Sequence, residues 1–345
     1  MNHFKSILIT VILCSYGFCF SQGNQSFVIC AGNASCELAA KVAKYLGVSL
    51  SGVEVGHFND GETSIKVKKS VRNKEVFVIQ STCSTKDTSV NNSIVELLLL
   101  IRTLKRGSAG QITAVIPYYG YARQDRKTKP RVPISASDIA MFLEAAGADR
   151  VVAVDLHCGQ IQGFFQKIPV DNLFAISTFV DHAKSLELEN PVVVSPDAGG
   201  VDRAKKFRDA LEDKGISSGF AMVVKQRCEA GSIASVDLVG DVKDRDVLIT
   251  DDIVDTAGTL VSVVKELKKF GAKKVYVYIT HPVLSNNALD RIEKSDITEM
   301  ITTDTIPIDA ELPANMKKLS VAPLLAKAIS LIHNGQPIAT LFDAD

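Results

Sequence analysis

An acidic segment after a strongly apolar run carries the clearest chemistry in this sequence. The run Val247–Thr250 leads into Asp251 and Asp252, and the segment Asp255, Thr256, Ala257, Gly258, Thr259 follows. Small residues and threonine hydroxyls at the start of a predicted helix suit a phosphate group, because helix N-terminal amides point at anions. Adjacent carboxylates would repel that anion unless they held sugar hydroxyls or a metal ion. The segment predicts a site for a phosphorylated sugar; the ordinary alternative is a capped turn with solvated carboxylates.

Three further apolar runs end in side chains suited to phosphate or metal ions. Arg123 and Gln124 open a basic segment, and arginine donates paired hydrogen bonds to phosphate oxygens. His157 and Asp197 each follow a run of their own. One imidazole and one carboxylate, completed by water and phosphate oxygens, suit magnesium. A solvated basic loop and a structural histidine are the plain alternatives.

A short turn predicts contacts to a nucleotide. Phe58 offers a ring that can stack on a base, and Asp60, Gly61 and Glu62 follow it within five residues. Carboxylates here can accept hydrogen bonds from an amino group or a ribose. A surface turn explains the same residues equally well.

Two cations stand two positions apart on a segment that the sequence predicts to be extended. Lys225 and Arg227 therefore face the same side. On a loop that closes over substrate they would neutralise charge on transferring phosphoryl oxygens. Charged protection of an edge strand is the alternative.

Alternating apolar runs and amphipathic stretches must position these residues. Runs at 27–30, 76–80, 112–118, 151–156, 192–197, 247–252 and 275–280 read as strands. Strands that are apolar on both faces and separated by helices indicate parallel sheets in an α/β fold, with ligands beyond the carboxyl ends of the strands. Ser35 is expected to cap the helix after the first strand, and Gly47 to end it. We expect two domains, 23–170 and 171–345, after an N-terminal extension, 1–22.

Composition excludes several classes of function. The 345 residues carry 39 basic and 39 acidic side chains without long runs of one sign, so no nucleic-acid-binding surface is predicted. The seven cysteines include no CxxC pair, which favours reduced thiols. The apolar run 7–20 resembles a secretory or organelle-targeting signal and is short for a membrane span, so no stable membrane partner is expected. An upstream start codon added to a cytosolic protein, or a tolerated tail, is the other interpretation.

Several motifs in one order resemble the class I phosphoribosyl pyrophosphate synthetases, or ribose-phosphate pyrophosphokinases. They are FNDGE, YARQD, PISA, DLH, QIQGFF, PVDNL, VSPDAGG, VGDVKDR, DDIVDTAGT and HNGQPIATLF, and the similarity runs from about Phe27 to the carboxyl terminus. The resemblance implies two related phosphoribosyltransferase-like domains, each a mainly parallel sheet flanked by helices. It also implies transfer of the pyrophosphoryl group of MgATP to the anomeric hydroxyl of ribose 5-phosphate, releasing AMP.

Family roles carry over onto matching positions. By resemblance the ATP contacts are Phe58, Asp60, Gly61, Glu62, Arg123 and Gln124, and the magnesium positions are His157 and Asp197. Lys225 and Arg227 match the catalytic loop pair. Arg227, Asp251, Asp252 and Asp255 through Thr259 match the ribose 5-phosphate site. The family further implies a homo-oligomer, a hexamer with active sites near subunit interfaces, regulation by ADP and phosphate, and a cytoplasmic location.

Two departures from the family pattern bear on regulation. The segment Ser84–Asn92 is longer than its counterpart, and Gly159 stands where many relatives have a small polar residue. A non-catalytic subunit of a synthetase complex, a phosphoribosyltransferase and a secreted binding protein are the alternative functions. The first should have lost a metal or loop residue, and the second has no use for FNDGE or for Lys225.

Overall fold

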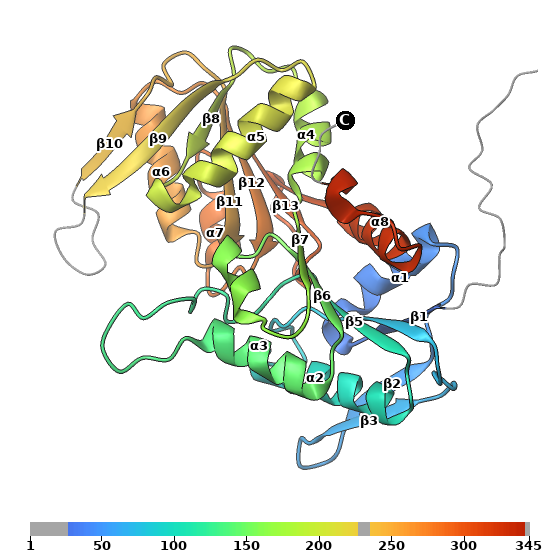
Figure 1. The fold of residues 1–345 in the computed structure, drawn as a ribbon. Coiled ribbons are helices and arrows are strands. Elements are labelled where there is room, and N and C mark those ends of the chain that lie inside the picture. Colours follow the sequence, from blue (N-terminus) through green and yellow to red (C-terminus); the bar gives the residue numbers. More distant parts are fainter. Residues whose placement is uncertain (1–26, 227–234, 342–345) are drawn as a thin grey trace, which may run out of the picture.

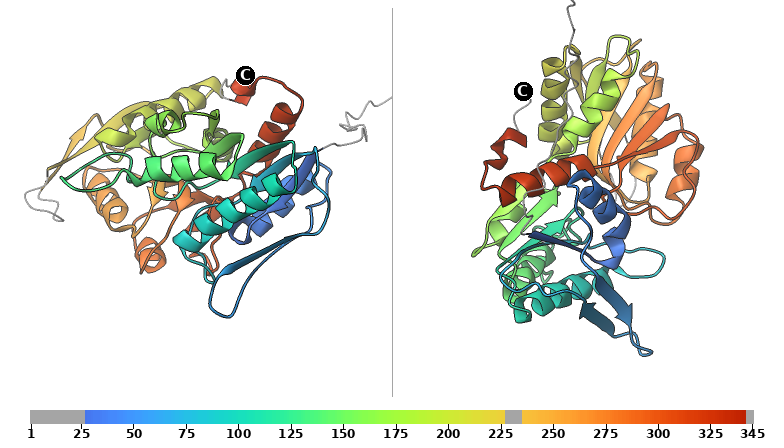
Figure 2. Two further views of the ribbon diagram at one scale, coloured as in Figure 1. Left: turned by 60° about the horizontal axis from the view of Figure 1, so that its bottom comes forward. Right: turned by 90° about the vertical axis from the view of Figure 1, so that its right-hand side faces the viewer.

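The chain folds into two lobes, each built on a β-sheet (Figure 1). The computed structural model describes residues 27–226 and 235–341. In the first sheet the order is β1-β4-β5-β6-β7 and every neighbouring pair is parallel. The bounds are β1 (Phe27–Ala31), β4 (Glu75–Ile79), β5 (Gln111–Ile116), β6 (Arg150–Val154) and β7 (Val170–Leu173). A hairpin of β2 (Val53–His57) and β3 (Thr63–Val67) projects from this lobe (Figure 2).

The second sheet has the order β10-β9-β8-β11-β12-β13-β14. Its neighbouring strands are parallel except for β9 and β10, which pair antiparallel. The bounds are β8 (Val192–Ser195), β9 (Gly219–Gln226), β10 (Ser235–Val239), β11 (Val247–Val254), β12 (Val275–Pro282), β13 (Glu299–Thr303) and β14 (Met316–Leu319).

Helices cover both faces of the two sheets. The α-helices are α1 (Cys36–Tyr45), α2 (Val90–Arg106), α3 (Ser135–Ala146), α4 (Ile176–Lys184), α5 (Val201–Asp213), α6 (Gly258–Lys269), α7 (Ala288–Glu293) and α8 (Ala322–His333). The short 3-10 helices are η1 (Asn33–Ser35), η2 (Gly159–Phe164), η3 (Ala198–Gly200) and η4 (Ile338–Leu341). Helices α2 and α3 bury one face of the first sheet, and α6 and α7 bury one face of the second.

One continuous hydrophobic core joins the lobes. It combines apolar side chains of α1, α4, α5 and α8 with those of both sheets, including Ile79 from β4 and Tyr278 from β12. Helix α8 follows the second sheet in the chain, yet it packs beside α1 (Figure 1). His333 at its end contacts Glu75 of the first sheet, with 2.6 Å between Nδ1 and Oε2. The relative position of the two sheets is therefore set by buried contacts rather than by a linker alone.

The predicted α/β class is confirmed, and all seven apolar runs form strands. The runs are buried on both faces, as in β4, where Val76, Phe77 and Val78 are fully inaccessible. Helix ends follow local chemistry too: Ser89 caps α2 by accepting from the Asn92 amide, and Gly147 ends α3 at φ 100°.

Two details differ from expectation. Ser35 does not cap α1; its hydroxyl accepts a hydrogen bond from the Ser81 amide across the lobe instead, at 2.8 Å. The expected domain boundary between residues 170 and 171 falls inside β7, which pairs with β6 in the first sheet. The strand is hard to recognise in the sequence because it is only four residues long and the polar Asp171 and Asn172 separate its two apolar ends.

The N-terminal extension 1–22 lies outside the described residues. Within residues 27–226 and 235–341 no helix combines the length and apolar character needed to cross a membrane. The four cysteines between residues 27 and 226, namely Cys30, Cys36, Cys83 and Cys158, are free thiols, as predicted.

The shared core predicts a large cost for removing one of its rings. Phe207 on α5 is fully buried, with its ring 5.0 Å from that of Tyr278. Phe207→Ala should lower the free energy of unfolding by about 3–5 kcal/mol. The matched control is Phe270→Ala, because Phe270 is 41% exposed and its loss should cost less than about 0.5 kcal/mol. Urea unfolding at one protein concentration measures both, and equal losses would contradict this account of the core.

Candidate active site

A cleft of about 1450 Å³ opens where strands of both sheets end. Its walls come from the loops after β5 and β6 in the first lobe and after β8 and β11 in the second. Ligands of parallel α/β sheets bind at this carboxyl edge. Ten of the predicted site residues line it: Arg123, His157, Asp197, Asp251, Asp252, Asp255, Thr256, Ala257, Gly258 and Thr259.

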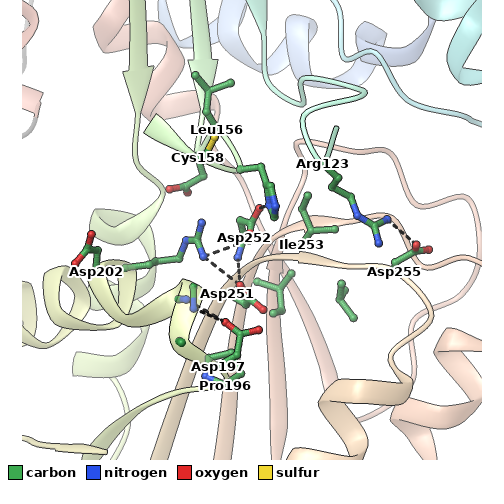
Figure 3. Close-up of a pocket in the computed structure, with 18 of the residues that line it drawn as sticks. Arg123, Leu156, Cys158, Pro196, Asp197, Asp202, Asp251, Asp252, Ile253 and Asp255 are labelled. Carbon is green, nitrogen blue, oxygen red and sulfur yellow. Dashed lines mark hydrogen bonds and ion pairs between the residues drawn. The ribbon is translucent and has the colours of Figure 1, made fainter. Parts of the chain in front are cut away.

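A network of charges forms the floor of the cleft. Asp251 and Asp252 lie near the end of β11, and Arg203 from α5 reaches both (Figure 3). The Arg203 Nη1 atom is 3.1 Å from Asp251 Oδ1 and 3.2 Å from Asp252 Oδ1. On the other side, His157 Nδ1 is 2.7 Å from Asp252 Oδ2. A cation and an imidazole thus hold together two carboxylates that would otherwise repel each other.

The two carboxylates differ in acidity because their partners differ. Burial raises the pKa of Asp251, and the negative charge of Asp252 raises it further against the opposing charge of Arg203. Burial acts in the same direction on Asp252, but the hydrogen bond with His157 and the charge of Arg203 outweigh it and lower the pKa. The hydrogen bond to Asp252 raises the pKa of His157 in turn. Asp252 is therefore the carboxylate that stays ionised, and Asp251 is the one that can hold a proton.

The loop 255–259 shapes a cradle at the start of α6. Ala257 precedes the helix at φ 59°, a left-handed conformation, so the chain turns sharply before Gly258. Arg291 on α7 holds this turn by donating to the Thr256 carbonyl oxygen at 2.7 Å. A Cβ at Gly258 would meet no protein atom closer than 3.7 Å. The protein itself therefore has room for a side chain at this position. A glycine here would leave that space open for an anion bound at the start of the helix.

An ion pair spans the mouth of the cleft. Arg123 Nη1, from the loop after β5, lies 2.7 Å from Asp255 Oδ2 (Figure 3). Burial acts to raise the pKa of Asp255, but the hydrogen bond from Arg123 outweighs it and lowers the pKa. The pair joins one residue predicted to bind ATP to one predicted to bind ribose 5-phosphate, and both side chains line the same cavity.

His157 and Asp197 both line the cleft and offer one imidazole nitrogen and one carboxylate as donors for a metal ion. Asp197 is the first residue after Ser195-Pro196, and its Oδ1 accepts hydrogen bonds from the amides of Gly199 and Gly200. Because His157 uses Nδ1 for Asp252, its Nε2 is the nitrogen left to face a ligand. Among residues 27–226 and 235–341 no group of three or more histidine, cysteine or acidic side chains could hold a metal. Such a donor set suits magnesium, which keeps water and phosphate oxygens in its shell.

The residues predicted to contact adenine lie outside the cleft. Phe58, Asp60, Gly61 and Glu62 form the tip of the β2–β3 hairpin, where Asp60 Oδ1 accepts from the Glu62 amide and Gly61 has φ 94°. None of these four residues lines the cleft, and Phe58 is 60% exposed. The tip forms the surface turn that the motif also allowed.

Of the remaining predicted residues, Gln124 and Lys225 lie in the part of the chain that the structure describes. Gln124 does not line the cleft; its Oε1 accepts from the Ser135 hydroxyl at 2.7 Å, beside the start of α3. Lys225 belongs to β9 and stands opposite Val236 of β10. Arg227 lies outside the described residues.

Sequence reasoning missed two arginines that organise the site. Arg203 stands four residues before Phe207 on α5, so it shares the buried face of that helix, and a charge at such a position is a signal of a buried partner. Arg291 carries no comparable signal, because its helix α7 is short and its side chain contacts only a backbone carbonyl.

The two departures from the family pattern lie at the contact between the lobes and in the cleft. In the segment Ser84–Asn92, the Lys86 amide donates to Asp309 of the second lobe, so this segment joins the two lobes. Gly159 begins η2 and lines the cleft.

Comparison with known proteins gives consistent similarities. Residues 27–147 match the family described as the N-terminal domain of ribose phosphate pyrophosphokinase, and residues 225–343 match the phosphoribosyl synthetase-associated domain. The ribose-phosphate pyrophosphokinase of Campylobacter jejuni is 45% identical over 318 residues, which are 92% of this chain and 99% of that protein. That of Vibrio parahaemolyticus is 46% identical over 91% of this chain and 98% of its own.

One solved structure shares both the sequence and the fold. The crystal structure of phosphoribosylpyrophosphate synthetase from Mycobacterium smegmatis is 40% identical, with a TM-score of 0.82, and the match covers 90% of this chain and 99% of that one.

The acidity of Asp251 predicts how stability depends on pH. Its pKa is raised in the folded state, so its contribution to stability is complete below the unfolded pKa of about 3.9 and is lost as pH rises through the folded pKa. Asp251→Asn should therefore become progressively more stable than the wild type as pH rises. Thermal unfolding from about pH 5 to about pH 9 measures this difference.

Asp213→Asn provides the control, because Asp213 is exposed at the far end of α5 and should differ little from the wild type at any pH. An Asp251→Asn variant that followed the wild type throughout the range would show that burial does not raise this pKa.

Proposed function

This chain belongs to the ribose-phosphate pyrophosphokinase family, so it transfers the pyrophosphoryl group of ATP to ribose 5-phosphate, and we propose that the transfer takes place in the cleft between its lobes. The observation that carries the proposed location is the meeting of an acidic pair, the loop 255–259 at the start of α6 and basic side chains in one cavity. The catalytic relatives favour this activity over a non-catalytic subunit or a phosphoribosyltransferase.

Ribose 5-phosphate fits the second-lobe side of the cleft. The amides and hydroxyls of residues 255–259 would hold the 5-phosphate at the start of α6, where the helix favours an anion. Asp251 and Asp252 would accept hydrogen bonds from the ribose hydroxyls. Because Asp252 stays ionised while Asp251 can carry a proton, the pair can bind a polyol without presenting two full negative charges.

The pyrophosphoryl group would lie between the lobes. The anomeric hydroxyl of ribose 5-phosphate attacks the β-phosphorus of ATP, and AMP leaves as the bond to the α-phosphate oxygen breaks. The protein's contribution is positioning and neutralisation of charge, as in phosphoryl transfer generally. Arg123 contributes from the first lobe, and we propose that Lys225, on β9, and Arg227 contribute as well.

Magnesium is the proposed cofactor, entering with ATP. Asp197 and His157 are the residues that would hold it, together with phosphate oxygens and water. Bound there, it would neutralise charge on the phosphate oxygens.

We further propose that the chain forms a homo-oligomer in which the β2–β3 hairpin serves the cleft of a neighbouring copy. Support comes from the hairpin tip, which presents an exposed aromatic ring and lines no part of its own cleft. An adenine placed against Phe58 would bury that ring. The family resemblance extends this proposal to a hexamer, to regulation by ADP and phosphate, and to a cytoplasmic location.

Removing the proposed catalytic lysine should abolish most of the activity. Lys225→Ala should lower kcat for AMP formation from MgATP and ribose 5-phosphate by about 100-fold or more, because charge on the transferring group loses a counter-ion. Lys265→Ala, an exposed lysine on α6, should stay within about twofold of the wild type. Wild-type protein that forms no AMP would contradict the proposed function; active Lys225→Ala would contradict only the role of the lysine.

Mixed oligomers test the proposed position of the hairpin. Phe58→Ala should raise the KM for ATP about tenfold through lost stacking. Chains carrying Phe58→Ala and chains carrying Lys225→Ala, coexpressed and assayed at ATP well below the wild-type KM, should regain up to about a quarter of the wild-type activity, since a cleft with intact Lys225 can then meet an intact neighbouring hairpin. If each hairpin served its own cleft, the mixture would show no recovery beyond the sum of the two separate variants.

A further inference from the structure

Asp155 stands in an unusual conformation where β6 enters the cleft. Its φ is +43°, in the left-handed region that residues other than glycine seldom occupy. It lies directly after Val154, the last residue of β6, and two residues before His157. Such a conformation persists only when its surroundings hold it, and it is favoured near functional sites. The direction of the chain at Asp155 decides where His157 points.

Two consecutive residues of the other lobe hold Asp155. Thr280 on β12 donates its hydroxyl to Asp155 Oδ2 at 2.7 Å. His281 Nε2 lies 3.0 Å from the carbonyl oxygen of Val154 and 3.1 Å from that of Asp155. We call this pair the Thr280–His281 clamp. It grips both the side chain and the backbone of the turn.

The surroundings of His281 determine its tautomer. Both partners of Nε2 are carbonyl oxygens, which only accept, so Nε2 carries the hydrogen. Nδ1 lies 3.0 Å from Thr305 Oγ1, and the Thr305 hydroxyl itself donates to the Thr280 carbonyl oxygen at 2.8 Å. The side chain is 2% exposed, and burial lowers its pKa, so the ring remains neutral. The clamp is thus a fixed donor rather than a titrating group.

Strand β12 is also the neighbour of β11, the strand that contains Asp252. It pairs in parallel with β11, and His281 stands opposite Ile253, the residue after Asp252. His157 and Asp252 come from different lobes. Strand β12 contacts the chain on both sides of their contact, because it binds the turn before His157 and pairs with the strand that contains Asp252. That contact is 2.7 Å long, and a displacement of the turn by about 1 Å would take it beyond hydrogen-bonding distance.

We propose that the Thr280–His281 clamp positions His157 for pyrophosphoryl transfer by holding Asp155 in its left-handed conformation. The clamp acts through the turn and touches no substrate. This inference rests on the proposed function for its kinetic consequence, but its structural consequence, an ordered turn at 155–163, can be measured without any activity.

Paired variants separate the hydrogen bond from the bulk of the ring. His281→Leu replaces the ring with an apolar side chain of similar size that has no hydrogen-bond donor. We expect kcat to fall by about 10- to 100-fold, because misplacing a catalytic group has costs of this size. The KM for ribose 5-phosphate should change little. His281→Gln can place its amide nitrogen near the position of Nε2 and should recover most of the loss. Thr280→Val removes the side-chain contact alone and should lower kcat to a lesser extent.

The control is another buried histidine. His182 on α4 is 7% exposed, and its Nδ1 lies 3.3 Å from the Tyr278 hydroxyl, away from the turn. His182→Leu should lower the melting temperature as His281→Leu does, yet leave kcat unchanged. A general loss of stability would instead affect the two variants alike.

Amide hydrogen exchange, followed by mass spectrometry on the full chain, provides the second measurement. Peptides covering residues 155–163 should exchange faster in His281→Leu than in the wild type, and not in His281→Gln or His182→Leu. If the wild type formed no AMP, the proposed function would fail, and this exchange would still decide the role of the clamp.

Three results would overturn the proposal. One is wild-type kcat together with wild-type exchange in folded His281→Leu. Another is an equal loss in the Gln and Leu variants, which would remove the hydrogen bond as the cause. Should His281→Leu fail to fold, Thr280→Val decides, and unchanged kcat and exchange in that variant would refute the clamp.

Discussion

Like charges at the end of β11 set the main constraint on this site. Asp251 is half-buried and the adjacent Asp252 is buried, so their repulsion has to be offset before any phosphate can approach. Arg203 and His157 provide the offset from opposite sides, one from α5 and one from the other lobe. The acidic pair is therefore stable only when α5, β11 and the turn after β6 are correctly placed. That requirement links the chemistry of the cleft to the packing of the entire chain.

Packing satisfies this requirement because the lobes share a core instead of meeting at a flexible joint. Apolar side chains of α1 and α8 continue into those of both sheets, and the buried hydroxyl of Ser81 donates to the Thr305 carbonyl across the boundary. Rigid placement of this kind favours a site assembled from both lobes. The hairpin of β2 and β3 is different, since its tip lines no part of the cleft of its own chain.

Similarity to catalytic relatives over almost the whole chain accounts for the activity, and the cleft accounts for where it would take place. The same arrangement gives distinct roles to neighbouring groups. Asp252 stays ionised because His157 and Arg203 hold it, whereas Asp251 shares Arg203 with Asp252, lies beside the negative charge of Asp252 and retains its proton more readily. Residues with identical side chains at consecutive positions thus offer different chemistry to a bound sugar.

The sequence by itself determined the α/β class, the strands that end at the cleft, and the loop at 255–259, because these depend on local patterns of apolar residues, glycine and threonine. It also identified His157 and Asp197 as residues at strand ends. Only the tertiary structure revealed that Arg203 joins the two aspartates, that Ser35 bonds to Ser81 rather than to its own helix, and that the hairpin tip lies away from its own cleft. Contacts between residues tens or hundreds of positions apart decide these features, and no local pattern in the chain encodes which distant partner a polar side chain will meet.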